Sequence, residues 1–503
     1  MRRILLLAGL VFHFVTLFSQ RQDTTVYSFH QIVAVGNDNM VAVLANDKEQ
    51  PTKLYLKYID TLDQVIAEKF INLNRLGIRG QLEAIFHWNG KLSILSSLYY
   101  PGPQRNHLIF KQYELPSLEE TASKEIDEAY TPGLYRIPFG YSLSPDSTKI
   151  LFYSWSYAIP DDPARLSLHV LDQQLGLIWQ NYNLLPFNNE TLYIYGCQVD
   201  NQGKAYILCE NYEGKVSRNM TVRPNKIKYF ALMMEPNVNE LRVYPLEIED
   251  RTIEGLRFTM EDNNDLHAAG FFREKNKRTF SGVFLFRVDG ESKKLTRKLL
   301  PISKELYDDA YAPTGDEPTF NPQKRGFSGY VADRLELADD GSIFLVAEQR
   351  PDLQGRTPAY EYNDLLAFKI SPRRTLDWMV RVPKRQRGFY GTLSIFSYAM
   401  FEEDGRLFLL FNDQVGNDDS WQKGRTLDVY QGGKTANMLV RILEDGSWKS
   451  HDISALIDSK AQMTVYPSYC WSLGDRLLIY GEQIENDQLK GYFVTLDWEL
   501  LGR

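Results

Sequence analysis

The residues that could do chemistry in this 503-residue chain are, first, pairs of adjacent carboxylates. Examples that lie in predicted loops are Asp161-Asp162, Asp308-Asp309 and Asp418-Asp419. A glycoside hydrolase needs two carboxylates about 5 to 9.5 Å apart, and sequence alone cannot show such a spacing. We interpret the pairs as solvated acidic loops, and a hydrolase or lyase stays open as an alternative.

Histidine, a frequent general base and metal ligand, is scarce, with seven in the chain. His87 and His267 lie beside predicted turns. His169 occupies the strand position that Lys57 and Lys111 fill in equivalent strands, so we expect an outward-facing polar residue there. No two histidines have metal-ligand spacing, and the motifs of zinc peptidases, serine hydrolases, P-loop proteins and dinucleotide-binding proteins are absent. The sequence therefore predicts no catalytic residue, no metal-ligating residue and no cofactor, and it leaves open a calcium ion among the acidic loops.

The three cysteines are Cys197, Cys209 and Cys470. Cys197 and Cys209 flank a predicted turn and, depending on the strand register, could face each other across a hairpin and form a disulfide in an oxidising compartment. Two buried thiols are the alternative. Three cysteines are too few for a disulfide-stapled scaffold.

The chain is acidic, with a formal net charge of −8. An acidic chain without a basic stripe argues against a nucleic-acid partner. We interpret the one basic run, Lys384-Arg385-Gln386-Arg387, as a solvated loop.

The amino terminus has the pattern of a secretory signal. Arg2 and Arg3 precede an apolar stretch over residues 4–18, which is too short for a membrane anchor. We therefore predict a signal peptide at 1–20 and one exported domain at 21–503 that does not span a membrane. We expect it in the periplasm or at the outer membrane, with the cell surface as an alternative.

A repeated sequence motif occurs throughout the rest of the chain. A Gly, Asn or Asp turn followed by a short apolar run recurs eight times at intervals of about 52 to 77 residues, within or above the period of propeller blades. The copies begin near Gly36, His87, Ser144, Val199, Glu261, Ala338, Glu402 and Ser472.

Each copy has a short strand before the turn and two further strands after the apolar run, which predicts a four-stranded antiparallel meander. The second strand is apolar on both faces, as a strand between neighbouring sheets must be. We predict an all-β fold, a single eight-bladed β-propeller, with seven blades as the alternative and residues 24–29 as a segment that could close the ring. The expected blades are approximately 24–73, 80–125, 137–185, 192–248, 253–302, 328–383, 392–454 and 464–503.

The repeat also resembles known families. The sequence SPDSTKILFYSW at 144–155 is similar to the repeat of TolB-type and WD40-like exported propellers. The combination YEYNDLLAFKIS and LDWMVRVPKRQ resembles large cell-envelope propellers of the Bacteroidota, whose functions are mostly unassigned. The resemblance implies a propeller fold in a cell-envelope setting, and it implies no catalytic residue.

The long loops are predicted to share one face. In such a meander, second-to-third loops and blade-to-blade crossings emerge together, opposite the short turns. Long loops are usually functional or disordered, and here they fall at 126–136, 157–165, 213–226, 303–327, 351–362, 384–391 and 413–437.

Aromatic residues in these loops suggest binding, because aromatic rings and arginine are enriched in interface hot spots. The expected contact residues are Tyr307, Tyr311, Phe320, Tyr360, Tyr362, Phe389, Tyr390, Trp421 and Tyr430. We predict a non-enzymatic module that holds a protein partner, as in an outer-membrane secretion or motility assembly. A glycan-binding protein and a propeller-based glycan hydrolase or lyase are the alternatives.

Overall fold

The structure is a computed structural model of the chain. It describes residues 15–17, 20–22, 25–36, 39–47, 49–60, 64–130, 137, 139–156, 163–188, 191–212, 227–238, 240–275, 279–306, 329–350, 359–389, 393–422, 427–433, 435–457, 463–474, 476–485, 488–499 and 501.

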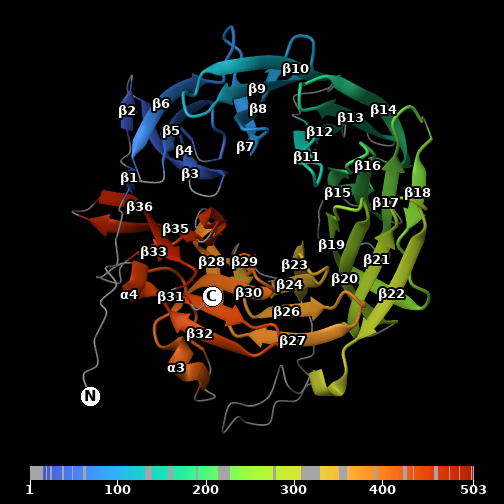
Figure 1. Cartoon of the computed structure of the whole chain (residues 1–503), viewed down its shortest axis with the longest axis vertical. Helices are drawn as coiled ribbons and strands as arrows, with labels where there is room; N and C mark the ends of the chain where they lie inside the picture. The colour runs from blue at the N-terminus through green and yellow to red at the C-terminus, as the bar shows by residue number, and fades with distance from the viewer. Residues whose placement is uncertain are drawn as a thin grey trace.

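Eight antiparallel sheets surround a central axis in the part of the chain that the structure describes (Figure 1). This confirms the predicted eight-bladed propeller over the seven-bladed alternative. The strands of blades 1 and 2 are β2 (Gln20–Gln22), β3 (Thr25–Val35), β4 (Asn39–Ala45), β5 (Lys53–Ile59), β6 (Val65–Asn72), β7 (Gly80–Trp88), β8 (Lys91–Tyr100), β9 (Arg105–Glu114) and β10 (Glu120–Tyr130). Those of blades 3 and 4 are β11 (Phe139–Leu143), β12 (Lys149–Ser156), β13 (Pro163–Asp172), β14 (Leu177–Asn188), β15 (Leu192–Val199), β16 (Ala205–Tyr212), β17 (Ile227–Met234) and β18 (Arg242–Pro245).

The other half of the ring is built in the same way. Blades 5 and 6 contain β19 (Arg251–Met260), β20 (Leu266–Glu274), β21 (Gly282–Val288), β22 (Leu295–Pro301), β23 (Tyr330–Leu337), β24 (Ile343–Gln349), β26 (Leu365–Ile370) and β27 (Leu376–Val382). Blades 7 and 8 contain β29 (Ala399–Glu403), β30 (Arg406–Gln414), β31 (Thr435–Ile442), β32 (Trp448–Asp452), β33 (Thr464–Val465), β34 (Trp471–Leu473), β35 (Arg476–Glu485) and β36 (Gln488–Asp497).

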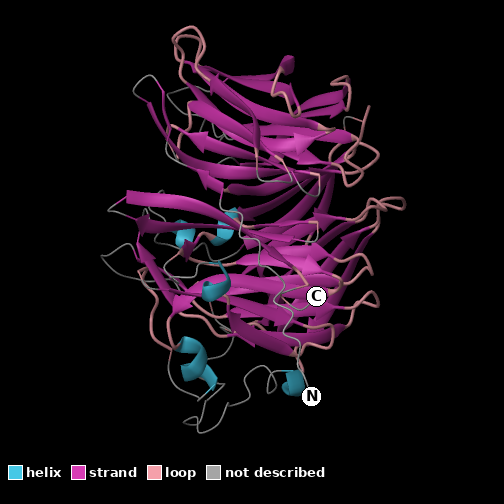
Figure 2. Cartoon of the chain, turned by 60° about the vertical axis from the view of Figure 1, so that its left-hand side comes forward, coloured by secondary structure: helices cyan, strands magenta, loops and turns pink. Residues whose placement is uncertain are grey.

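Short helices and one extra ribbon complete the fold. The helices are α3 (Asn417–Gln422), α4 (Ser454–Ile457), η1 (Leu393–Ile395) and η2 (Pro467–Tyr469), and the ribbon is β25 (Ala359–Tyr362) with β28 (Gln386–Phe389). Figure 2 shows strands throughout, with the few helices at mid-height and in the lower part of the view. Within the described residues, no helix combines the length and the apolar character needed to cross a membrane.

The outer strand of blade 8 comes from the other end of the chain. Strand β1 (Val15–Leu17) pairs with β36, with Val15 opposite Phe493 and Leu17 opposite Gly491. The segment suggested by the sequence for this closure, residues 24–29, instead falls almost entirely in β3, the first full-length strand of blade 1. Strand β1 lies inside the stretch predicted to be a signal peptide.

A hydrophobic cluster lies between each pair of adjacent blades among the described residues, including blades 8 and 1. Strand β24 shows how one sequence serves two clusters. Leu345 belongs to the cluster with blade 5, whereas its neighbours Phe344 and Val346 belong to the cluster with blade 7. Because successive side chains point to opposite faces, a second strand that contacts two blades must be apolar throughout, as its sequence is.

The short turns are joined from blade to blade by hydrogen bonds. The indole of Trp88 donates to the carbonyl of Ser147 at 2.9 Å, and the amide of Asp146 donates to the Asn201 side chain at 2.9 Å. Asn201 in turn donates to the carbonyl of Asp262 at 2.8 Å. These turns therefore tie blades 2 to 5 together and form a scaffold.

Candidate functional site

On the opposite face, insertions from blades 6 and 7 join into one small structure that we call the cap, made of β25, residues 384–389 with β28, α3 and Tyr430. Strand β25 lies in a second-to-third loop and β28 in a blade-to-blade crossing, and the two pair antiparallel. Tyr430, from the blade 7 loop, donates its amide to the carbonyl of Arg385 and accepts from the amide of Arg387, both at 2.9 Å. Here the two kinds of long loop share one face, as predicted.

A buried ion pair lies beneath the cap. The ammonium group of Lys384 is 2.7 Å from a Glu348 carboxylate oxygen, and neither side chain has exposed area. Lys384 also donates to the carbonyl of Tyr362 and the side-chain oxygen of Gln386, both at 3.0 Å. Burial lowers the pKa of Lys384, while Glu348 acts in the opposite direction.

The prediction of a solvated basic loop is therefore wrong for half of the run. Lys384 and Gln386 are buried, whereas Arg385 is exposed and Arg387 is half-buried. The run is extended and leads into β28, so alternate side chains point inward and outward. The outward Arg387 pairs with Glu361 of β25.

Glu348 holds more than one partner. It accepts from the Arg350 guanidinium at 2.7 Å and from the Ser397 hydroxyl at 3.0 Å. Arg350 is also 3.2 Å from Asp333. Burial acts to lower the pKa of Arg350, but Glu348 and Asp333 outweigh it and raise that pKa. The charges below the cap thus neutralise one another.

Side-chain amides connect the cap to blades 7 and 8. Gln386 donates to the carbonyl of Asn412 at 2.6 Å. Asn412, on β30, donates to the carbonyls of Ile395 and Val465, each at 2.7 Å. A buried amide that satisfies several backbone groups fixes their relative positions, so the base of the cap is rigid.

Asp413 follows Asn412 and is also buried. Burial raises its pKa to about 6, although the Asn417 side chain, which donates to it at 2.7 Å, and Lys384 act to lower it. Asp413 therefore changes its charge in a pH range where an exposed aspartate is fully ionised.

We expect Asp413→Asn to stabilise the protein relative to the wild type at pH 7.5 but not at pH 4. The native state holds the Asp413 proton up to about pH 6, whereas the unfolded state releases it near pH 3.8. Wild-type stability is therefore lost as pH rises through this window, by on the order of 1 to 3 kcal/mol. Urea unfolding of both proteins at the two pH values measures the difference. A gap that is independent of pH would contradict the assignment.

The predicted contact residues differ in exposure. Tyr360 and Phe389 are 42% and 45% exposed, and the register of the β25–β28 ribbon places them on its opposite faces, Phe389 on the outward face with Arg387. Tyr362 is half-buried, with the Arg350 guanidinium 5.4 Å from its ring centre, and Trp421 has the Arg381 guanidinium 5.3 Å from its own.

Tyr430 has no exposed surface. Its ring packs 5.8 Å from Phe396 below the cap, so it is a packing residue rather than the contact residue suggested by its place in a long loop. Four other residues suggested as contacts lie outside the described residues: Tyr307, Tyr311, Phe320 and Tyr390.

The carboxylate pairs do not form a described site. Asp161-Asp162 and Asp308-Asp309 lie outside the described residues. Asp418 and Asp419 lie in the first turn of α3, where Asp418 accepts from the Ser450 hydroxyl at 2.6 Å.

His169 is not outward-facing, which corrects the expectation from its strand position. It is buried between blades 2 and 3, with Nε2 3.0 Å from the Ser167 hydroxyl and 3.3 Å from Asp127. Burial acts to raise the pKa of Asp127, but His169 holds it below its usual value. The imidazole is accommodated because the neighbouring blade supplies a carboxylate. Ser167 and Asp127 both contact Nε2 of His169, whereas in a catalytic triad the serine and the aspartate contact different ring nitrogens. This is therefore not the arrangement of a catalytic triad.

The cysteines are free and buried, so the possible disulfide is not formed and the alternative of two buried thiols is confirmed. Cys197 is opposite Ile207 and Cys209 is opposite Ile194, with a bulge between, so the two do not face each other. Burial raises the pKa of Cys209 and Cys470 to about 12, which makes them poor nucleophiles.

A repeated feature of the long-loop face was missed from the sequence. Glu210, Glu348 and Glu482 all follow the apolar run of a second strand, and all are buried. Glu210 accepts from the hydroxyls of Tyr195 and Tyr212, and Glu482 from those of Tyr466 and Tyr480. The sequence did contain a signal for this feature, because a glutamate follows the apolar run of the second strand in three of the repeats.

Comparisons with known proteins add little to these observations. No family model and no curated protein matches the chain. The β-propeller domain of the Trilobed protease from Pyrococcus furiosus has a TM-score of 0.37 and 11% identity over 84% of this chain and 94% of its own. An oligogalacturonate lyase in complex with manganese has a TM-score of 0.38 and 11% identity over 97% of this chain and 98% of its own. Prolyl oligopeptidase B from Galerina marginata has a TM-score of 0.40 and 10% identity over 94% of this chain and 56% of its own. The assignment of the fold therefore rests on the eight blades themselves.

Proposed function

We propose that this protein is a non-enzymatic binding module that holds a protein partner on the cap. The observation that carries the proposal is the exposure of Phe389 on the outward face of a ribbon whose base is fixed by buried ionic and amide contacts. Exposed aromatic rings on a rigid base lose little conformational entropy on binding, and such residues dominate interface energies.

The chemistry beneath the cap supports binding over catalysis. Glu348 and Lys384 contact each other without exposed side-chain area, and Asp413 is buried against Asn417. A substrate would have to displace the cap to reach them. Carboxylates that converge on one accessible cavity would instead favour the hydrolase or lyase alternative.

The setting that we propose is the cell envelope, where such a module would serve as a subunit of an outer-membrane assembly for secretion or motility. This part of the proposal rests on the charged and apolar pattern of residues 1–20 and on the resemblance of the repeats. Sequencing the amino terminus of the mature protein tests it. Export predicts a terminus near residue 21 and a blade 8 without β1, whereas a protein that keeps β1 paired with β36 must retain residues 15–17.

The partner surface can be tested by photo-crosslinking in the native host. A photoreactive phenylalanine analogue at Phe389 should give a discrete crosslinked species. The same analogue at Gln174, exposed on a short turn of the opposite face, should not. Equal labelling from both positions, or none from Phe389, would count against the cap.

We expect Phe389→Ala to weaken binding of the crosslinked partner by about 2 kcal/mol, as for an interface hot spot. The melting temperature should change by only a few degrees, because Phe389 is 45% exposed and its ring is not part of the core. Titration of the purified partner, together with thermal unfolding, separates the two effects. If Phe389→Ala binds normally and a glycan array detects binding that Trp421→Ala removes, the glycan alternative replaces this proposal.

A further inference from the structure

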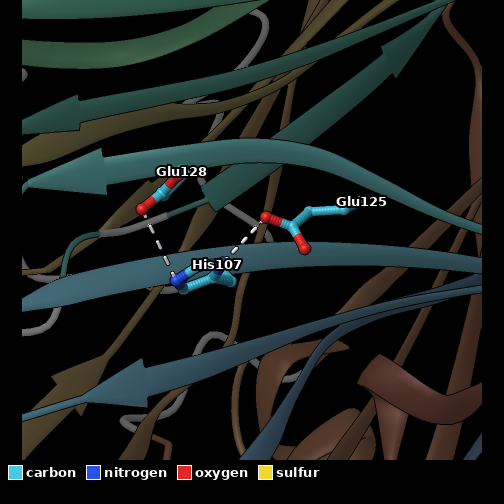
Figure 3. Close-up of side chains that lie close together, drawn as sticks. All are labelled: His107, Glu125 and Glu128. Atoms are coloured by element: carbon cyan, nitrogen blue, oxygen red, sulfur yellow. Dashed lines mark hydrogen bonds and ion pairs between the residues drawn. The ribbon is translucent and has the colours of Figure 1, made fainter.

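A second group of chemically competent side chains lies on the outer part of blade 2, away from the cap. His107 on β9 lies between two carboxylates of β10 (Figure 3). Its Nδ1 is 2.8 Å from Glu125 Oε1, and its Nε2 is 3.8 Å from Glu128 Oε1. One donor atom from each of the three residues lies within 4.8 Å of the others.

A β-bulge brings the two carboxylates together. Residues 125 and 128 of a regular strand would point to opposite faces, since alternate residues share a face. The register of β10 against β9 shifts between Glu125 and Asp127, so that Ile126 is an extra residue. Ile126 and Asp127 are both buried, and Glu125 and Glu128 both point outward. The bulge thus places both carboxylates beside His107.

The three side chains are accessible and their chemistry is mixed. The exposed fractions are 20% for His107, 49% for Glu125 and 41% for Glu128. The edge-on ring of Tyr100, 4.7 Å away, limits the orientations of the imidazole. One imidazole nitrogen with carboxylate oxygens is a ligand set for divalent transition metals, whereas Mg²⁺ and Ca²⁺ take oxygen ligands.

The distances are compatible with shared coordination. Ligands at about 2.0 to 2.2 Å from a zinc ion lie roughly 3 to 3.5 Å from one another. His107 Nδ1 is already close to that separation from Glu125, whereas Glu128 lies beside the other ring nitrogen, Nε2. An ion bound to Nδ1 therefore requires Glu128 to turn towards Nδ1 by a side-chain rotation. Arg105, 2.6 Å from Glu128, is a competing cation.

We propose that His107, Glu125 and Glu128 bind one divalent transition-metal ion, with water completing the coordination. Such an ion would join the third and fourth strands of blade 2 at the bulge. It would also neutralise the negative charges of Glu125 and Glu128, for which Arg105 supplies a single guanidinium.

The other group of suitable composition among the described residues does not support the same inference. Asp265 is held by the Arg287 guanidinium at 2.5 Å and by the amide of Gly290 at 2.8 Å, and His267 is buried against Glu261. The Asp265 carboxylate already has hydrogen-bond partners, and the His267 imidazole has almost no exposed area. An ion would therefore have to displace these internal hydrogen bonds and ion pairs.

Isothermal titration of the full chain with zinc chloride tests the proposal. We expect one ion per chain. His107→Ala and Glu125→Gln should each weaken its binding by at least the roughly 10- to 100-fold that loss of an outer-shell partner costs. Arg105→Ala should strengthen it, because Glu128 then has no competing cation. The matched control is Glu120→Gln, which breaks the Lys111–Glu120 pair on the same two strands and should leave zinc binding unchanged.

Three results would overturn the assignment. These are no zinc binding by the wild type, undiminished binding by His107→Ala, and equal competition by Mg²⁺, which would mean that the imidazole is not a ligand. Circular dichroism of each variant shows whether it has folded. Glu125→Gln keeps the shape of the side chain, so the proposal can still be tested if His107→Ala misfolds.

Discussion

Replacing Glu348 by alanine is expected to lower the free energy of unfolding by about 3 to 5 kcal/mol. The substitution leaves the Lys384 ammonium in a site without solvent and without its carboxylate, and it removes one of the two acids that hold Arg350. A buried charge deprived of its partner cannot recover hydration without local opening, so the cap should detach. Urea unfolding gives the free energy, and hydrogen exchange over residues 384–389 reports the opening.

A matched exposed pair is the control. Lys111→Ala breaks the pair with Glu120 on the surface of blade 2 and should cost less than about 1 kcal/mol. Glu348→Gln/Lys384→Met should lose less stability than the sum of its single changes, because neither charge remains. A Glu348→Ala protein as stable as the Lys111→Ala protein would show that the buried pair does not hold the cap.

Phe29→Ala is expected to cost about 3 to 5 kcal/mol, the usual range for a buried phenylalanine. Phe29 lies where blade 1 meets blade 8, and its ring centre is 4.0 Å from Tyr480, 5.2 Å from Phe493 and 5.3 Å from Tyr469. Removal of the ring leaves a cavity at the interface that closes the propeller. Hydrogen exchange should therefore increase in both β3 and β36.

Tyr130→Ala provides the comparison, because this ring on β10 is 53% exposed and should contribute within about 0.5 kcal/mol. Equal losses of stability in the two variants would show that ring closure does not depend on the aromatic cluster. Faster exchange spread evenly over all blades would show that the ring opens as one unit rather than between blades 8 and 1.

The propeller could be predicted because its cause is local and repeated. Each second strand must be apolar on both faces to contact two blades, as Phe344 and Leu345 do, and a Gly, Asn or Asp turn must precede it. These constraints recur in the residues themselves. The placement of long loops on one face follows from strand order, which needs no knowledge of side-chain contacts.

The partners of polar residues could not be predicted, because they depend on register between blades. The sequence shows that His169 occupies a strand, but not that Asp127 of the preceding blade lies beside it. In the same way, Lys384 is buried because two separate insertions, residues 359–362 and 386–389, pair as a ribbon above Glu348. His107 meets both of its carboxylates only because of an extra residue in β10.

The contact of Phe29 with Phe493 has a consequence for the order of biosynthesis. These residues are separated by nearly the whole chain, so blade 1 leaves the ribosome long before blade 8, its neighbour in the closed ring, has been synthesised. Its face with Ala42 and Tyr55, buried in the finished ring, stays uncovered during that interval. Non-local pairing of this kind is slow and exposes apolar surface to aggregation. The nascent chain should therefore depend on a holding chaperone until the last blade has been synthesised.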